Sequence, residues 1–423
     1  MIRFLIKGLL RDKNRSLLPL IVVAIGVMLT VFMHAWVTGI IGDSIEFNAK
    51  FETGHVKVTT RAYAKNSGQL PIDLALGNVT DIKQTLRDEY PDMNWVERTK
   101  FSGLIDVPDE TGETRAQGPA LGISADILNK DSKEKERLNL NDALVRGKFP
   151  ENNGEILMSE GFSQKLGVSP GDEVTLISST MYGSMAFYNF IVSGTVTFGI
   201  KNLDKGTVIV DISDARQALN MYDASAEILG FFQEGFFQKN RAGEITEEFN
   251  MKYSEQEDEF SPYMFSMRDQ NNLSTLIDMS EMLTTIIIFV FILVLSIVLW
   301  NTGLISGLRR YGEIGVRLAI GESKGHVYRA MINESIAIGI AGSLLGTVVG
   351  LGISYLLQKY GLDFGDVMGE SAIMMPNVYR ARITPPTYFI GFIPGVFSIV
   401  LGTVLSGIGI YKRNTAQLFK ELE

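Results

Sequence analysis

The sequence predicts an α-helical membrane protein with four transmembrane helices and a large extracytoplasmic α+β domain, in which an α/β part carries a β-rich insertion. The apolar residues of the 423-residue chain cluster in four blocks, each long enough to cross a bilayer core about 30 Å thick. The charge is divided as well: residues 42–278 hold 38 acidic and 23 basic side chains, so their net charge of −15 leaves +6 of the total −9 elsewhere. Short basic segments stay in the cytoplasm, which places the acidic domain on the opposite side.

The chain begins with a short amphipathic segment and a first span. In residues 1–16, Arg3, Lys7 and Arg11 are four positions apart and opposite an apolar face, which predicts an interfacial helix on the cytoplasmic side. The n-region of a secretory signal has the same pattern. However, the apolar block at 17–41 is longer than the apolar core of a signal peptide, and no A-x-A cleavage site follows it. We therefore expect an uncleaved first transmembrane helix at 17–41.

Residues 42–278 have the mixed patterning of an α/β domain. Alternating or β-branched runs predict strands at 54–60, 95–107, 116–123, 155–158, 173–177, 187–198 and 207–211. Helical periodicity predicts helices at 79–90, 160–166, 213–222 and 244–251. Strands are densest in the middle, so we expect an α/β part built from both ends and a β-rich insertion near 112–205. The mixed charge run at 131–137 predicts a solvated loop or helix end.

Three further spans follow the domain. We expect them at 282–305, 332–357 and 385–411, with a short outer loop at 358–384 and a cytoplasmic tail at 412–423. The loop at 306–331 has five basic side chains and two acidic ones, which predicts a cytoplasmic location. Pro394 is expected to kink the last span.

The third predicted span carries two stripes of small residues. Gly342, Gly346 and Gly350 recur every four positions, and a second stripe lies beside them at Ser335, Gly339, Ser343 and Thr347. Small side chains at this spacing allow helix backbones to approach closely. We therefore predict that Gly339, Gly342, Gly346 and Gly350 pack against two partner helices.

Several stretches carry a resemblance to a known family. The most specific is the cytoplasmic stretch 313–325, EIGVRLAIGESKG, and the others are RSLL at 15–18, AIGV at 24–27, GHVKV at 54–58 and residues 159–174 with KLGVSPGD. Together with one span, a large domain and then three spans, they resemble the FtsX/MacB-type permeases of ABC transporters. The GHV of residues 54–56 resembles the lipoprotein-releasing LolC/LolE-like subgroup.

This resemblance implies a non-catalytic transport subunit. Two copies of a separate ABC ATPase would bind ATP and magnesium and dock on the cytoplasmic loop, and this chain would hold no cofactor. The sequence agrees in having no G-x-x-x-x-G-K-[ST] phosphate loop. The resemblance places the ATPase-coupling residues at Glu313, Ile314, Val316, Arg317, Leu318, Ile320 and Gly321.

The resemblance also implies a cargo and further partners. The chain would sit in the bacterial inner membrane, with the large domain in the periplasm, and would extract or release a lipoprotein or similar amphipathic cargo. Four spans are few for enclosing a path, so we expect a second permease chain, identical or paralogous. Contacts with membrane lipids and with a periplasmic carrier or outer-membrane partner are also expected, and nucleic acid is not. The alternatives are a MacB-type drug or peptide exporter and an FtsX-like signalling subunit that activates an envelope hydrolase.

Apolar side chains near the outer ends of the first two spans are candidates for cargo contact. They are Phe32, Met33, Trp36, Leu283, Ile287 and Phe291. These side chains could hold acyl chains, but lipid-facing packing explains them equally well.

Metal and nucleophilic chemistry are not expected. The chain has no cysteine, and its three histidines, His34, His55 and His326, are far apart in the sequence. His34 falls near the outer end of the first span, where we expect an interfacial histidine.

Overall fold

The computed structural model describes residues 13–198, 203–254, 258–270, 273–308, 311–364 and 378–412. It divides into two compact units. The helical unit comprises residues 1–43, 279–363 and 378–423, and the sheet unit comprises residues 44–278 and 364–377. The predicted interfacial helix lies outside the described residues up to residue 12, as does the predicted tail from residue 413.

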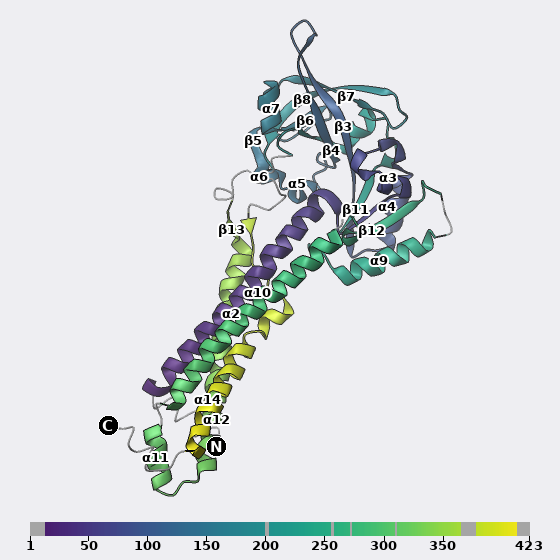
Figure 1. The fold of residues 1–423 in the computed structure, drawn as a ribbon. Coiled ribbons are helices and arrows are strands. Elements are labelled where there is room, and N and C mark those ends of the chain that lie inside the picture. The colour runs from purple at the N-terminus through teal and green to yellow at the C-terminus, as the bar shows by residue number, and fades with distance from the viewer. Residues whose placement is uncertain are drawn as a thin grey trace. The chain divides into compact units, whose positions relative to one another are not determined.

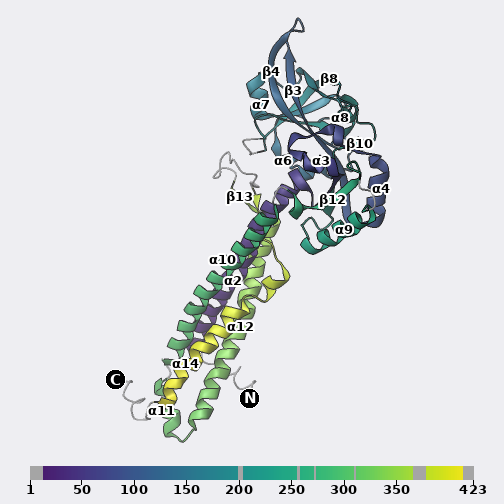
Figure 2. The same cartoon turned by 45° about the vertical axis from the view of Figure 1, so that its right-hand side comes forward.

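Four long helices make up the helical unit and run side by side (Figures 1 and 2). They are α2 (Lys13–Asn48), α10 (Leu273–Leu308), α12 (Lys324–Tyr360) and a fourth helix that ends in α14 (Ile399–Lys412). The stretches long and apolar enough to cross a membrane are Leu17–Thr53, Leu273–Ser306, Lys324–Tyr360 and Pro385–Ile408. A short helix, α11 (Tyr311–Ala319), lies between α10 and α12 in the chain. The predicted class, four transmembrane helices and an α/β domain, is confirmed.

The fourth helix is irregular where a proline kink was predicted. It begins with a 3₁₀ turn at Pro385–Tyr388 and includes a π-helical segment at Ile393–Ser398, with Pro394 at its start. Proline lacks the amide hydrogen that an α-helical bond would use, and a wider turn accommodates that loss. Between α12 and this helix, β13 (Leu362–Asp363) pairs with β14 (Val378–Tyr379).

The sheet unit is built on one ten-stranded sheet. Its order is β12-β1-β11-β3-β4-β9-β6-β8-β5, and β7 pairs with both β3 and β8. The bounds are β1 (Val56–Thr60), β3 (Met93–Pro108), β4 (Thr114–Ala125), β5 (Leu144–Gly147), β6 (Glu155–Ser159), β7 (Glu173–Ser179), β8 (Met185–Val196), β9 (Thr207–Asp211), β11 (Glu227–Phe232) and β12 (Pro262–Ser266). A separate two-stranded sheet joins β2 (Leu76–Gly77) and β10 (Ala224–Ser225).

Strand β3 connects the two ends of this sheet. Its first part pairs with β11, at 93–98, and its second part pairs with β4, at 99–108. The helices of the unit are α3 (Arg61–Lys65), α4 (Val79–Glu89), α5 (Glu134–Arg137), α6 (Leu140–Ala143), α7 (Glu160–Leu166), α8 (Ile212–Ala218) and α9 (Lys239–Lys252). One core contains Trp95 and Phe249, from the ends of the segment, and another contains Phe101, Phe162 and Phe190, from its middle.

Two expectations from the sequence differ from the structure. In the ten-stranded sheet, strands β5, β11 and β12 were not predicted. Every residue of β11 is buried, so its sequence shows no alternation of apolar and polar side chains, and unlike the equally buried β9 it has no run of β-branched residues. The charge run at 131–137 is not wholly solvated. Glu134 is fully buried there, and its carboxylate binds Arg98 Nε at 2.7 Å and Arg137 Nη1 at 2.9 Å.

Candidate functional site

Helix α11 contains most of the residues predicted to couple to an ATPase, and the structure divides them between two faces. Ile314 is only 3% exposed and packs against Val327 and Met331 of α12, with Leu318 beside them. Val316 and Ile320 are 47% and 80% exposed. The buried face therefore attaches α11 to α12, while an apolar edge of Val316 and Ile320 is left uncovered in this chain.

The charged and terminal residues of α11 are also placed. Glu313 Oε1 lies 3.9 Å from Arg317 Nη2, an exposed pair one helical turn apart, and Arg317 Nε lies 4.0 Å from Glu322. Gly321 has φ +96°, a conformation that favours glycine, and its amide donates to the Leu318 carbonyl. Gly321 thus ends the helix and starts the tight turn into α12.

The small residues of α12 contact two different helices of the same chain. A Cβ at Gly342 or Gly350 would lie 2.7 Å or 2.9 Å from Val23 or Val31 of α2, and one at Gly346 would overlap the Ala24 carbonyl. Gly339 instead faces the fourth helix, where a Cβ would lie 3.1 Å from Val396 Cα. The glycine stripe therefore accommodates close intramolecular packing.

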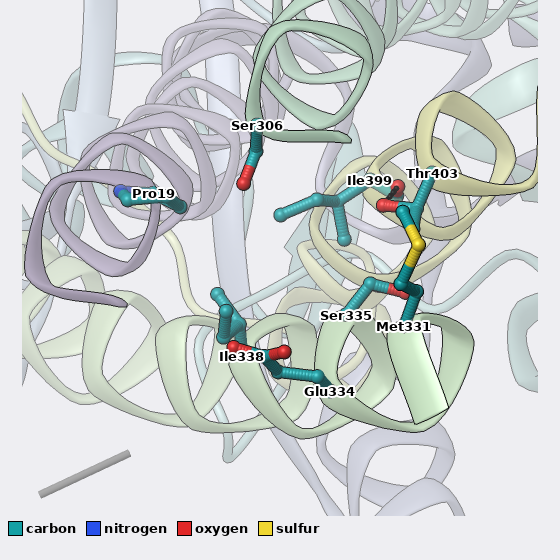
Figure 3. Close-up of a pocket in the computed structure, with 8 residues that line it drawn as sticks. All are labelled: Pro19, Ser306, Met331, Glu334, Ser335, Ile338, Ile399 and Thr403. Atoms are coloured by element: carbon teal, nitrogen blue, oxygen red, sulfur yellow. Dashed lines mark hydrogen bonds between the residues drawn. The ribbon is translucent and has the colours of Figure 1, made fainter. Parts of the chain in front are cut away.

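All four long helices meet around a small polar cavity (Figure 3). Its lining is Pro19 from α2, Ser306 from α10, Met331, Glu334, Ser335 and Ile338 from α12, and Ile399 and Thr403 from α14. The volume of about 20 Å³ suits one water molecule. The cavity is therefore shared by all four long helices of the unit.

The residues predicted to contact cargo lie along α2 and α10. Phe32 and Trp36 stack with their ring centroids 6.3 Å apart, and Leu283 and Ile287 are 48% and 45% exposed. Met33 and Phe291 are partly exposed. None of the six lines the larger apolar groove between α10 and the fourth helix. That groove of about 290 Å³ is lined by Phe289, Ile292, Leu293, Ser296, Ile297, Trp300, Phe397, Ser398 and Leu401. Sequence reasoning missed it because it joins helices about 100 residues apart in the chain.

The three histidines do not form a site. His34 is 8% exposed, and its Nδ1 lies 3.0 Å from Thr387 Oγ1, so it links α2 to the fourth helix and is more buried than an interfacial histidine. His55 is fully buried beside Glu46, with Nε2 to Oε2 at 2.9 Å, and His326 lies 3.6 Å from Glu322. Among the described residues, no group of histidine and acidic side chains has the arrangement of a metal site.

A comparison with known protein families identifies the part of the chain that contains α11. Residues 285–415 match the family described as FtsX-like permease C-terminal. This part of the chain is an FtsX-like permease domain. It begins within α10 and includes α11, α12 and the fourth helix, which supply the whole lining of the water-sized cavity except Pro19 of α2.

Two curated relatives also resemble the chain. The macrolide export ATP-binding/permease protein MacB of Bdellovibrio bacteriovorus is 31% identical over 131 residues, which are 31% of this chain and 20% of the relative. The lipoprotein-releasing system transmembrane protein LolC of Xylella fastidiosa is 22% identical over 257 residues, 59% of this chain and 58% of the relative. The chain thus spans less than two thirds of either relative's length. A solved structure of the periplasmic region of MacB from Actinobacillus actinomycetemcomitans aligns with a TM-score of 0.37 and 11% identity, over 55% of this chain and 95% of that chain.

Proposed function

We propose that this chain is the permease subunit of an ABC transporter in the bacterial inner membrane. ATP hydrolysis by a separate ATPase would drive the extraction or release of a lipoprotein, or a similar amphipathic molecule, from the membrane. The observation that carries the proposal is α11, because a helix attached to α12 by Ile314 leaves Val316 and Ile320 uncovered within the FtsX-like permease domain. An exposed apolar helix edge of this kind fits a groove on a partner protein.

The contacts within the helical unit support a path for the motion. Force applied to α11 would reach α12 through Ile314, Val327 and Met331. From α12 it would pass to α2 at Gly346 and to the fourth helix at Gly339, where the backbones are too close to slide independently. ATP and Mg²⁺ would be bound by the ATPase, and this chain would transmit the motion without catalysing a reaction.

A second permease chain is part of the proposal. Only 6% of the most apolar window of α10 is buried within this chain, against 39% for each of α2 and α12. The open side of α10 could pack against an identical or paralogous chain, and each chain would then carry one ATPase. Lipid would cover the remaining apolar surface.

The choice of cargo rests on the similarity of this chain to its curated relatives. The alignment with LolC extends over more of this chain than the alignment with MacB, which favours lipoprotein release over drug or peptide export.

On β8, Met185, Phe187 and Ile191 project from one face and are 70%, 63% and 53% exposed. We propose that this face meets a periplasmic carrier or an outer-membrane partner. An FtsX-like subunit that activates an envelope hydrolase would instead transport nothing.

The ATPase partnership can be tested by changing the apolar edge of α11. We expect the double variant Val316→Asp/Ile320→Asp to insert normally and to lose co-purification of the ATPase. Ser323→Asp is the matched control, since it adds a charge in the adjacent turn without removing apolar surface, and it should retain the ATPase. An undiminished ATPase yield with the double variant would refute the docking site.

The cargo can be tested in proteoliposomes that contain the complete complex. We expect ATP to release a fluorescent triacylated lipoprotein to an added carrier and to leave the distribution of a macrolide unchanged. ATP-driven movement of the macrolide alone would favour the exporter alternative. ATP hydrolysis with movement of neither molecule would favour the signalling alternative.

A further inference from the structure

The sheet unit contains a polar cavity that the proposed transport cycle does not use. Its volume is about 340 Å³, within the range of small-molecule sites. It lies among α3, the turn that follows α3, and strands β1, β3 and β11. The polar lining that matters here is Lys57, Lys100, Glu52, Glu227 and Tyr63.

Two ion pairs form one part of the cavity wall. Lys57 Nζ lies 2.7 Å from Glu227 Oε1, and Lys100 Nζ lies 2.6 Å from Glu52 Oε2. Both ammonium groups therefore already have a carboxylate partner. Asp269 adds a third carboxylate to the lining, so three acidic and two basic side chains face the cavity, a formal charge of −1. This balance favours a ligand with a positive charge.

Two buried polar atoms of the lining have no hydrogen-bond partner. They are the Tyr63 hydroxyl and Glu227 Oε2, on side chains whose residues are 1% and 3% exposed. Burial alone would raise the pKa of Glu227, but Lys57 and Lys100 outweigh it and the pKa is lowered, so this carboxylate is charged at neutral pH. A buried acceptor and a buried donor left unpaired are costly, and each is satisfied by a ligand of the opposite kind.

We propose that this cavity binds a small molecule that carries an ammonium group next to a carbonyl, as the amino terminus of a short peptide does. The ammonium would donate to Glu227 Oε2, and the Tyr63 hydroxyl would donate to the carbonyl oxygen. Leu70, Leu121 and Phe265 supply apolar surface for the adjoining side chain. Such a ligand supplies one donor and one acceptor where each is missing, and its charge complements that of the lining.

The probes are the tripeptide amide Ala-Leu-Ala and the same peptide with an acetylated amino terminus, titrated calorimetrically into the full chain purified in detergent. We expect saturable binding of the free amine and at least roughly tenfold weaker binding of the acetylated peptide, since acetylation removes the charge that Glu227 would pair. Equal affinity for the two peptides would overturn the proposal. So would the absence of binding by both, which would leave a cavity that holds water only.

Tyr63→Phe separates a ligand-binding role from a structural one. The variant removes a buried hydroxyl that has no partner, so the unliganded protein should melt at the same temperature or higher, while affinity for the peptide falls roughly 2- to 10-fold. Tyr90→Phe, in a buried site of the same unit away from the cavity, is the matched control and should bind the peptide like wild type. A lower melting temperature with unchanged affinity would assign the hydroxyl a structural role and overturn the site.

Discussion

The sheet unit and the helical unit hold their parts together by opposite means. The sheet unit buries long charged side chains in pairs, such as Arg98 with Glu134, both fully buried. The helical unit uses residues with almost no side chain, such as Gly346, which lies against the backbone of α2. Lipid is as apolar as a leucine side chain and gives helices little hydrophobic reason to associate, so close packing has to supply the attraction. In a water-facing unit the hydrophobic effect supplies it, and long polar side chains can be buried where each finds a partner.

The comparison assumes that the sheet unit and α11 are on opposite sides of the membrane. Cysteine labelling tests that assumption directly. A cysteine at Asp131 should react with an impermeant thiol reagent in spheroplasts, and a cysteine at Ser323 should react only after permeabilisation. Both positions are exposed, and the wild-type chain has no cysteine to give a background. Labelling of Ser323→Cys but not Asp131→Cys in intact spheroplasts would invert the topology and refute coupling through α11.

Breaking the buried ion pair should have the next largest effect. Glu134→Ala leaves the Arg98 guanidinium buried without its carboxylate, so we expect the sheet unit to lose roughly 3–5 kcal/mol in denaturant unfolding. The double variant Arg98→Met/Glu134→Leu should recover much of that loss, because no charge is then left unpaired. The control is Lys148→Met, which breaks an exposed pair with Glu151 and should leave stability unchanged. Equal effects of Glu134→Ala and Lys148→Met would show that burial does not matter to these pairs.

Enlarging a glycine tests whether close packing at glycine holds the helical unit together. Gly346→Leu places a side chain where a Cβ alone would overlap the Ala24 carbonyl, so we expect about 1–3 kcal/mol of overpacking cost and less folded protein after extraction in detergent. Gly352→Leu is the matched control on the same helix, because a Cβ there meets no atom within 4 Å. Fluorescence-detected gel filtration reports the folded fraction. If only Gly352→Leu reduces it, the glycine stripe does not hold α12 to α2.

The smallest expected effect is a dependence of stability on pH that is specific to the sheet unit. Burial alone would raise the pKa of Glu134, but Arg98 and Arg137 outweigh it, and the pKa lies below its ordinary value of 4.5. A lowered pKa in the folded state contributes stability above pH 4.5 that is lost as pH falls below it. The free energy of unfolding should therefore decline below about pH 4.5, and Glu134→Gln should show a shallower decline. An identical slope in the variant would assign the acid sensitivity to other groups.

Patterns that are local in the sequence were predictable, and pairings between distant residues were not. The four apolar blocks determine four long helices. The alternation in residues 173–177 marks strand β7, and the β-branched run in residues 207–211 marks strand β9. The fully buried β11 shows no alternation, so its sequence does not distinguish a strand from a buried helix. The charge run at 131–137 is equally misleading, because it predicts solvated side chains whereas Glu134 is buried and pairs with Arg98, 36 residues away.

The same contrast between local patterns and distant pairings holds for the candidate site. The resemblance places the coupling residues at 313–321, and the sequence sets Glu313 and Arg317 four positions apart. It does not reveal that Ile314 is covered by α12 while Val316 is not, since that depends on the angle at which the turn brings the two helices together. The same limit applies to the apolar groove and to the polar cavity around Tyr63, which are assembled from separate parts of the chain.

The hydrogen bond between His34 and Thr387 has a consequence for how the protein is made. The two residues are 353 positions apart, so the partner of a buried polar side chain in the first span emerges only near the end of synthesis. At a translation rate of about 5–20 residues per second, the first span waits roughly 20–70 seconds in the membrane before that bond can form. During this interval α2 also lacks Gly391 and Gly395, against which Val27 packs in the finished bundle. A nascent chain that stops short of the last span thus has a histidine without its hydrogen-bond partner and valines without the glycines they pack against.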